Sequence, residues 1–337
     1  MAGRGLGGAE TYATDIMLSL KRFKIDEICV LAPDGARTEE LIKAGVKTET
    51  HALAFRFGPI QKARIKELIA QEKPDLIHCW MRRAASLVPA GLDIPVIGWF
   101  GGYYDPKNFK HCTQFVGVSQ GIVDHMIEKG VAREKAHYIP TFPDVQDENT
   151  TADRAALDTP VDAPVILALS RLHQKKGLDT LLQAVKNLPE AYVWLAGEGP
   201  LRGKLEKLTK KLGLKNRVRF LGWRTDRGAL LRAANVCVLP SRYEPFGTVI
   251  LEAWAAGTPL VAARSAGPAA HVSDGENGLL IPIDDVDALQ KALGRALKDE
   301  DLRRNMISNG FQTYSRTYTR KAVTQRMINL YEKIVAA

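Results

Sequence analysis

A chain of 337 residues exceeds the roughly 250–300 residues at which single hydrophobic cores stop growing, so we expect two domains. No apolar run approaches the about 18 residues of a membrane span, and the polar, glycine-rich start lacks the apolar segment of a signal peptide. This pattern argues against an integral membrane protein and predicts a cytoplasmic location. The cysteines form no CxxC pair, so we expect reduced thiols and neither a zinc site nor disulfides.

The positive charge is unevenly distributed along the chain. The first 150 residues hold equal numbers of basic and acidic side chains, so the net charge of +9 lies in residues 151–337. Eleven basic residues fall between Arg202 and Arg232, against two acidic ones. Such a run is usually a solvated helix face, but it can also attract an anionic membrane surface or a phosphorylated acceptor. No aromatic platform or recognition motif accompanies it, so we expect no nucleic-acid partner.

Short apolar runs alternate with helical stretches along the whole chain, which predicts an α/β fold with parallel sheets covered by helices. In the first half, we expect strands at 27–32, 76–79, 96–99 and 115–118, and helices at 8–21, 59–71 and 120–129. In the second half, we expect strands at 165–170, 191–196, 218–221, 236–240 and 260–263, and helices at 177–187, 200–212, 227–233, 248–256 and 286–297.

Residues 139–164 contain four prolines and little periodicity, which is typical of an interdomain linker. We therefore assign residues 1–145 to an N-terminal domain and residues 146–317 to a C-terminal domain. The helical tail, about residues 318–337, is long enough to pack back onto the N-terminal domain.

The segment Gly3–Gly8 satisfies the pattern GxGxxG, which is found in dinucleotide-binding proteins. That fingerprint requires a strand directly before it, and only Met1 and Ala2 precede Gly3. We therefore expect the first strand of the N-terminal domain to be missing from this sequence. The pair Gly7-Gly8 at the head of a helix can still bring bare backbone close to a phosphate or a sugar, with a flexible tail as the alternative.

The stretch Ser170–Asp179 follows an expected strand and leads into a helix. Arg171 and Lys176 therefore emerge at the carboxyl edge of a parallel sheet, where open α/β sheets bind ligands. Arg171 can hold a diphosphate with two hydrogen bonds while Lys176 adds a point charge; a pair of surface cations is the alternative. Gly197 lies in another strand-to-helix turn whose backbone is open to a ligand.

The segment SRYEPFGTVILEAWAAG, residues 241–257, places Glu244 and Glu252 around the start of a buried helix. Glu252 is the only charged residue of this apolar helix, and burying an unpaired carboxylate costs on the order of several kcal/mol. Gly247 and Thr248 would open the helix, whose free N–H groups form an anion site. Carboxylates beside a phosphate-binding helix end suit a nucleotide sugar; alternatively, Glu252 pairs with a buried arginine.

In chain order, GGAE, SRL followed by KKG, AGEGP, RFLGW and EPFGTVILEAWAAGTPLVA resemble the glycosyltransferases of family 4, most strongly over residues 165–300. The resemblance implies a GT-B fold, with two Rossmann-like domains whose parallel sheets face each other across a cleft. It implies retaining, metal-independent transfer of a hexosyl unit from a nucleotide-diphosphate sugar to a glycolipid or saccharide, in envelope glycan synthesis of the lipopolysaccharide type. It also implies a UDP-sugar in preference to a GDP-sugar, no cofactor, and peripheral association with the inner membrane.

The resemblance also implies roles for single residues. The expected catalytic residues are Arg171, Lys176 and Glu244, with the two cations on the diphosphate and the glutamate at the sugar. Glu252 is expected to bind the ribose hydroxyls. The full set of expected donor-binding residues is Gly7, Gly8, Arg171, Lys176, Gly197, Glu244, Phe246, Gly247, Thr248 and Glu252.

One departure from the family concerns a histidine that its members commonly carry just after the strand matching residues 95–99. Gly101 stands at about that position here, so we expect the sugar contact to come from backbone or from Tyr103, Tyr104 or Asp105. This departure leaves open a homologue that binds a nucleotide sugar without transferring it. The glycine motif leaves open an NAD-dependent oxidoreductase.

Overall fold

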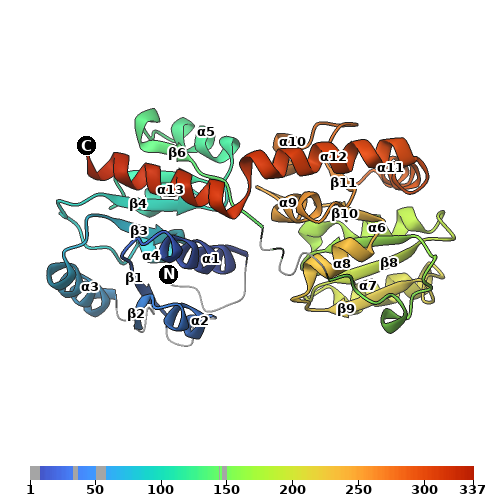
Figure 1. Cartoon of the computed structure of the whole chain (residues 1–337), viewed down its shortest axis with the longest axis horizontal. Helices are drawn as coiled ribbons and strands as arrows, with labels where there is room; N and C mark the ends of the chain where they lie inside the picture. The colour runs from blue at the N-terminus through green and yellow to red at the C-terminus, as the bar shows by residue number, and fades with distance from the viewer. Residues whose placement is uncertain (1–7, 33–36, 51–57, 144, 146–149) are drawn as a thin grey trace. The chain divides into compact units, whose positions relative to one another are not determined.

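The computed structural model describes residues 8–32, 37–50, 58–143, 145 and 150–337, and the chain divides into two compact units (Figure 1). Unit 1 comprises Met1–Phe142 and Arg320–Ala337, and unit 2 comprises Pro143–Thr319. Each unit combines helices with parallel strands, so the predicted α/β class is confirmed. The four cysteines are buried and free, as expected from their spacing: Cys29, Cys79, Cys112 and Cys237.

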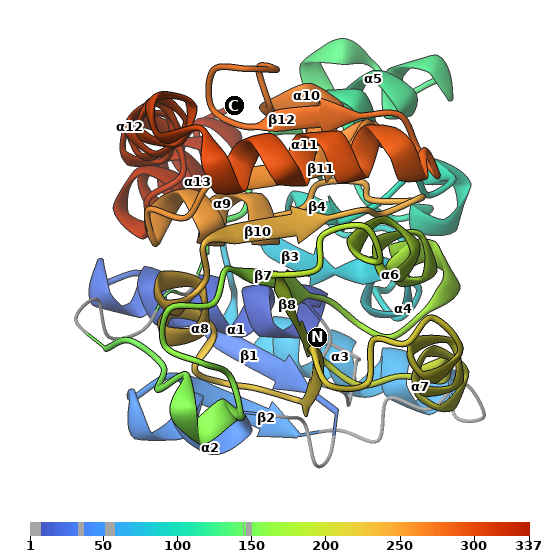
Figure 2. The same ribbon diagram turned by 90° about the vertical axis from the view of Figure 1, so that its right-hand side faces the viewer.

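Unit 2 is built on a six-stranded parallel sheet with the order β12-β11-β10-β7-β8-β9 (Figure 2). The strands are nearly continuous apolar runs because helices cover both faces of the sheet. Strand β7 lies between β10 and β8, so the order of the strands reverses there, and ligands bind at such switch points. The strands are β7 (Val165–Leu169), β8 (Tyr192–Ala196), β9 (Val218–Gly222), β10 (Val236–Leu239), β11 (Leu260–Ala263) and β12 (Leu279–Ile281).

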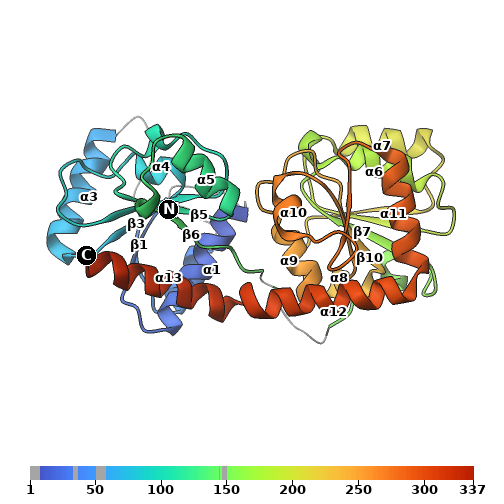
Figure 3. The same ribbon diagram turned by 90° about the horizontal axis from the view of Figure 1, so that it is seen from above.

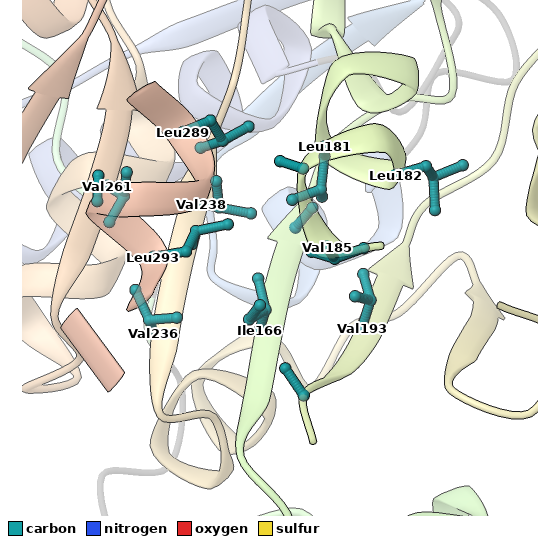
Figure 4. Close-up of a cluster of buried hydrophobic side chains, with 14 of the residues drawn as sticks. Ile166, Leu181, Leu182, Val185, Val193, Val236, Val238, Val261, Leu289 and Leu293 are labelled. Atoms are coloured by element: carbon teal, nitrogen blue, oxygen red, sulfur yellow. The ribbon is translucent and has the colours of Figure 1, made fainter. Parts of the chain in front are cut away.

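Helices form two layers around this sheet, with α6 and α7 along one side and α8 and α9 along the other (Figure 3). Side chains of α6 and α11 converge on β7 and β10, where Leu181, Leu293 and Ile166 are fully buried (Figure 4). This cluster is the core that fixes the carboxyl ends of the strands. The helices are α6 (Leu178–Val185), α7 (Arg202–Lys211), α8 (Arg227–Ala233), α9 (Thr248–Ala255), α10 (Ala266–His271), α11 (Val286–Lys298) and α12 (Glu300–Thr317).

The predicted linker is wrong over residues 150–164, which pack on unit 2. The guanidinium of Arg154 donates hydrogen bonds to the carbonyl oxygen of Ala233 at 2.7 Å and to Oδ1 of Asn235 at 2.9 Å. The backbone N–H of Ala152 donates to the carbonyl oxygen of Ala229 at 3.1 Å. The last carbonyls of a helix need donors from outside it, and Arg154 supplies the donor for the carbonyl of Ala233, the last residue of α8.

Unit 1 contains two parallel sheets, β1-β2 and β3-β4-β5-β6. Helix α13 packs against α1, where the hydroxyl groups of Ser19 and Thr324 lie 2.7 Å apart. The strands are β1 (Ile28–Leu31), β2 (Lys47–Thr50), β3 (Ile77–Trp80), β4 (Val96–Phe100), β5 (Gln114–Gly117) and β6 (Ala136–Tyr138). The helices are α1 (Gly8–Arg22), α2 (Thr38–Lys43), α3 (Gly58–Glu72), α4 (Met81–Ala85), α5 (Gln120–Glu128) and α13 (Arg320–Val335).

The strand that we expect to be missing would lie between the two sheets of unit 1. Within the described residues, β1 pairs with β2 alone and β3 pairs with β4 alone, and no described strand joins them. Residues 1–7 lie outside the described part of the chain. The absence of a first strand therefore stays a prediction.

Candidate active site

The carboxyl edge of the unit 2 sheet is formed by loops that hydrogen bond to one another through their backbones. The N–H of Gly197 donates to the carbonyl of Gly222 at 2.7 Å, which joins the loops after β8 and β9. The N–H of Tyr243 donates to the carbonyl of Lys175 at 3.2 Å, which joins the loops after β10 and β7. Because parallel strands bring their carboxyl ends to one edge, residues far apart in sequence meet here.

Two glycines allow these loops to approach so closely. A Cβ atom at position 197 would lie 2.0 Å from the carbonyl oxygen of Ser170, and one at position 177 would lie 2.0 Å from that of Pro240. Both glycines also have positive φ angles, 147° and 61°, which other residues rarely adopt. Gly197 and Gly177 therefore allow the loops at this edge to pack closely against one another.

Lys176 and Glu244 form an ion pair at this edge, although 67 residues separate them. The Nζ atom of Lys176 lies 2.5 Å from Oε2 of Glu244, and the two side chains are 23% and 14% exposed. Arg171 lies two residues after the end of β7, is exposed, and has no ion-pair partner among the residues that the structure describes. The predicted cation pair and the first predicted carboxylate thus lie on neighbouring loops.

Helix α9 begins at this edge without a side-chain cap. Gly247 precedes it with a φ angle of 89° and has no side chain with which to cap the helix, and the N–H of Ile250 donates to the carbonyl of Gly247 at 2.9 Å. Thr248 is the first helical residue, and the N–H groups at a helix start have no partner within the helix. Phe246 is buried, with its ring centre 4.6 Å from that of His271. The arrangement suits an anion at the helix end.

Glu252 lies deeper in the same helix and is 1% exposed. Its Oε1 atom lies 2.6 Å from Nη1 of Arg227, the first residue of α8, whose side chain is 35% exposed. An arginine partner was one of the two alternatives that the sequence left open. This arginine reaches in from the surface, so the pairing is also compatible with a carboxylate that meets ligand hydroxyls, and that role stays a prediction.

The remaining predicted residues lie in unit 1. Gly7 is outside the described residues, and Gly8 is the first residue of α1. A Cβ atom at position 101 would lie 2.4 Å from the indole ring of Trp99, so this ring fills the space of a side chain at Gly101. Tyr103 and Tyr104 lie on the following loop, where they are 36% and 37% exposed. We predicted that these residues could supply the sugar contact of the family histidine.

Two family models match almost the whole chain. Residues 149–313 match the family described as Glycosyl transferases group 1, and residues 6–147 match Glycosyltransferase Family 4. The chain is 34% identical over 326 residues to the lipopolysaccharide core biosynthesis glycosyltransferase LpsE of Rhizobium meliloti, covering 96% of this chain and 95% of that protein. The chain belongs to glycosyltransferase family 4.

A second relative from Rhizobium meliloti, the lipopolysaccharide core biosynthesis glycosyltransferase LpsD, is 30% identical over 98% of this chain and 96% of its own length. Anabaena HepE, solved in complex with UDP and glucose, superimposes with a TM-score of 0.84 at 23% identity, covering 98% of both chains. The lipopolysaccharide outer core galactosyltransferase WaaB superimposes with a TM-score of 0.73 at 17% identity, again over 98% of both chains. The fold of this family 4 member is therefore GT-B, as the resemblance implied.

We predict that unit 2 loses stability in mild acid because of His271. Burial lowers the pKa of His271 to about 4 from an ordinary value near 6.5, so the folded protein keeps this ring neutral where the unfolded chain protonates it. Stability is then lost as the pH falls from about 6.5 to about 4, by about 2 kcal/mol at pH 5. In calorimetry of the wild type and His271→Gln at pH 7 and pH 5, the variant should lose less stability. Equal losses would contradict the assignment.

Proposed function

We propose that this family 4 enzyme transfers a hexosyl unit from a UDP-sugar to a lipopolysaccharide core acceptor, with retention of the anomeric configuration. The observation that carries the proposal is the Lys176–Glu244 pair next to the uncapped start of α9. A cation and free helix N–H groups bind a diphosphate, while a carboxylate accepts hydrogen bonds from sugar hydroxyls. The acceptor class comes from the relatives LpsE and LpsD, and UDP comes from the HepE complexes.

The reaction breaks the bond between the anomeric carbon and the phosphate oxygen and forms a bond from that carbon to the acceptor oxygen on the same face. Negative charge grows on the departing UDP, and in this proposal Arg171, Lys176 and the N–H groups at Thr248 stabilise it. Glu244 orients the sugar and also holds Lys176 in place. The acceptor proton goes to an oxygen of the leaving diphosphate, so no separate protein base is required.

Replacing the two cations should slow transfer without unfolding the protein. We expect Arg171→Ala and Lys176→Ala each to lower kcat by about 10²–10³, the usual cost of removing one group that stabilises transition-state charge. Lys175→Ala is the matched control, because Lys175 lies 4.5 Å over the ring of Tyr243 and not against Glu244. Transfer measured with UDP-glucose and UDP-galactose, alongside circular dichroism, tests this expectation. Near-normal turnover in both variants would contradict the proposed role of these cations at the diphosphate. A wild-type protein that binds UDP but transfers no sugar would favour a degenerate homologue.

Removal of divalent metal should leave the activity unchanged. Across the described ranges, no three His, Cys, Asp or Glu side chains come together in a way that could hold a metal ion, and the cations already stand at the proposed diphosphate site. We expect full transfer activity in excess EDTA. A strict requirement for Mn²⁺ or Mg²⁺ would overturn metal-independent catalysis.

We propose that membrane association is peripheral and electrostatic. In the part of the chain that the structure describes, no helix has the length and hydropathy needed to cross a bilayer. Several arginines of the basic run are bound internally: Arg217 to the carbonyls of Leu188 and Ala191, and Arg219 to that of Asp158. The exposed charge comes from lysines on and after α7: Lys204, Lys207, Lys210, Lys211 and Lys215.

The proposed association should depend on salt. Binding to vesicles with 30 mol% anionic lipid is expected at low ionic strength and should disappear near 1 M salt, where the screening length is about 3 Å. Replacing Lys204, Lys207 and Lys211 by Gln should weaken it. Vesicle binding that survives high salt would contradict an electrostatic contact.

A further inference from the structure

Arg227 and Glu252 form the second ion pair next to the proposed nucleotide site. Arg227 is the first residue of α8, directly after the loop that follows β9, and Glu252 lies in α9. Nη1 of Arg227 and Oε1 of Glu252 lie 2.6 Å apart, with the arginine 35% exposed and the glutamate 1% exposed. The arginine therefore extends from the surface to a carboxylate that solvent hardly reaches.

The surroundings of Glu252 explain why it needs this partner. Its neighbours in α9, Leu251 and Ala253, are fully buried, and Cys237 of β10 is buried beneath the helix. Burial and, to a smaller degree, the negative charge of Glu252 raise the pKa of the Cys237 thiol, which places that charge against the strand. A cation beside a carboxylate in such surroundings favours the ionised form over the protonated one.

Ionisation decides what the carboxylate can bind. An ionised carboxylate only accepts hydrogen bonds, so it can receive both hydroxyl groups of a ribose, whereas a protonated one must donate its own proton. Hydrogen bonds to a charged acceptor are also roughly twice as strong as neutral ones. The cation that pairs with Glu252 therefore affects any hydroxyl that this residue binds.

Arg227 differs in its partner from other arginines of the same basic run. Arg224 pairs with Asp226 on its own loop, and Arg232, farther along α8, donates to the carbonyl of Thr150. Arg227 instead reaches across to α9 and ends on a carboxylate one helical turn inside the helix whose start lies at the diphosphate site.

We propose that Arg227 is a positioning residue that keeps Glu252 ionised and oriented to accept the ribose hydroxyls of the donor nucleotide. The inference rests on the proposed function, because it presupposes a nucleotide at this edge of unit 2. Arg227 thereby sets the preference of the site for a ribonucleotide over a nucleotide that lacks the ribose hydroxyls. A pair with a purely structural role would contribute to stability and leave this preference unchanged.

Calorimetric titration with UDP and with 2′,3′-dideoxy-UDP tests the proposal. The wild type should bind UDP about 10- to 100-fold more tightly than the dideoxy nucleotide, because the dideoxy nucleotide lacks the hydroxyls that hydrogen bond to the charged carboxylate. We call this factor the affinity ratio. In Arg227→Gln this ratio should fall to about threefold or less, through weaker UDP binding with an unchanged affinity for the dideoxy nucleotide. Arg227→Lys should keep part of the ratio, and Arg232→Gln, on the same helix, should keep all of it.

Each other outcome overturns the inference in a distinguishable way. If Arg227→Gln keeps the wild-type ratio of affinities for UDP and the dideoxy nucleotide, even with a lower melting temperature, the Arg227–Glu252 pair is structural. Equal weakening of both ligands would show that Arg227 binds the base or the phosphates itself. If Arg227→Gln does not fold, Arg227→Met decides, because a wild-type ratio in a variant that keeps the length of the side chain and lacks the cation would contradict the proposal. A wild type that binds neither nucleotide would instead defeat the proposed function.

Discussion

The site depends on two carboxylates in a largely apolar region and on the cations that pair with them. Glu244 lies in a loop and Glu252 in helix α9, but their partners come from elsewhere: Lys176 from the loop after β7 and Arg227 from the first residue of α8. The two carboxylates are 14% and 1% exposed, and a partner cation offsets the free energy that burying such a charge costs. The strand order, in which β10 lies next to β7, brings Lys176 and Glu244 together, and the packing of α8 on α9 brings Arg227 to Glu252.

The paired arrangement has a consequence for binding. In the proposed roles, Lys176 binds a phosphate and Glu252 binds a hydroxyl, while Glu244 contacts the sugar. Glu244 and Arg227 also hold their partners in position before a ligand binds. A site of this kind is organised before the substrate arrives, so less free energy is lost in ordering side chains on binding. The glycines at positions 177 and 197 contribute in the same way, by fixing the backbone of the surrounding loops.

Much of unit 2 could be predicted from the sequence, because its strands are apolar runs and its site residues follow those runs directly. The short strand β12 and the packing of residues 150–164 could not, since three residues show no periodicity and Arg154 finds its acceptors some 80 positions away. Arg227 was visible only as one cation in a basic run. Its position at the start of a helix after a strand was a signal, but its partner depends on how α8 and α9 pack.

Unit 1 was harder to predict for a related reason. Strands β2 and β6 are short and partly exposed, so they lack the apolar run that marks the strands of unit 2. The glycine at position 101 looked like the loss of a functional histidine. The structure shows that the indole of Trp99 occupies the space that a side chain at position 101 would need. Hydrophobic patterning does not reveal such a contact between residues two positions apart.

The central claim is that the carboxyl edge of the unit 2 sheet binds the donor nucleotide. Hydrogen–deuterium exchange measured with and without saturating UDP tests it most directly, because it locates the ligand without relying on catalysis or on substitutions. The account predicts slower exchange of the amides in residues 170–177 and 243–250, with no change in β2. Saturable UDP binding that leaves both segments unprotected would contradict it.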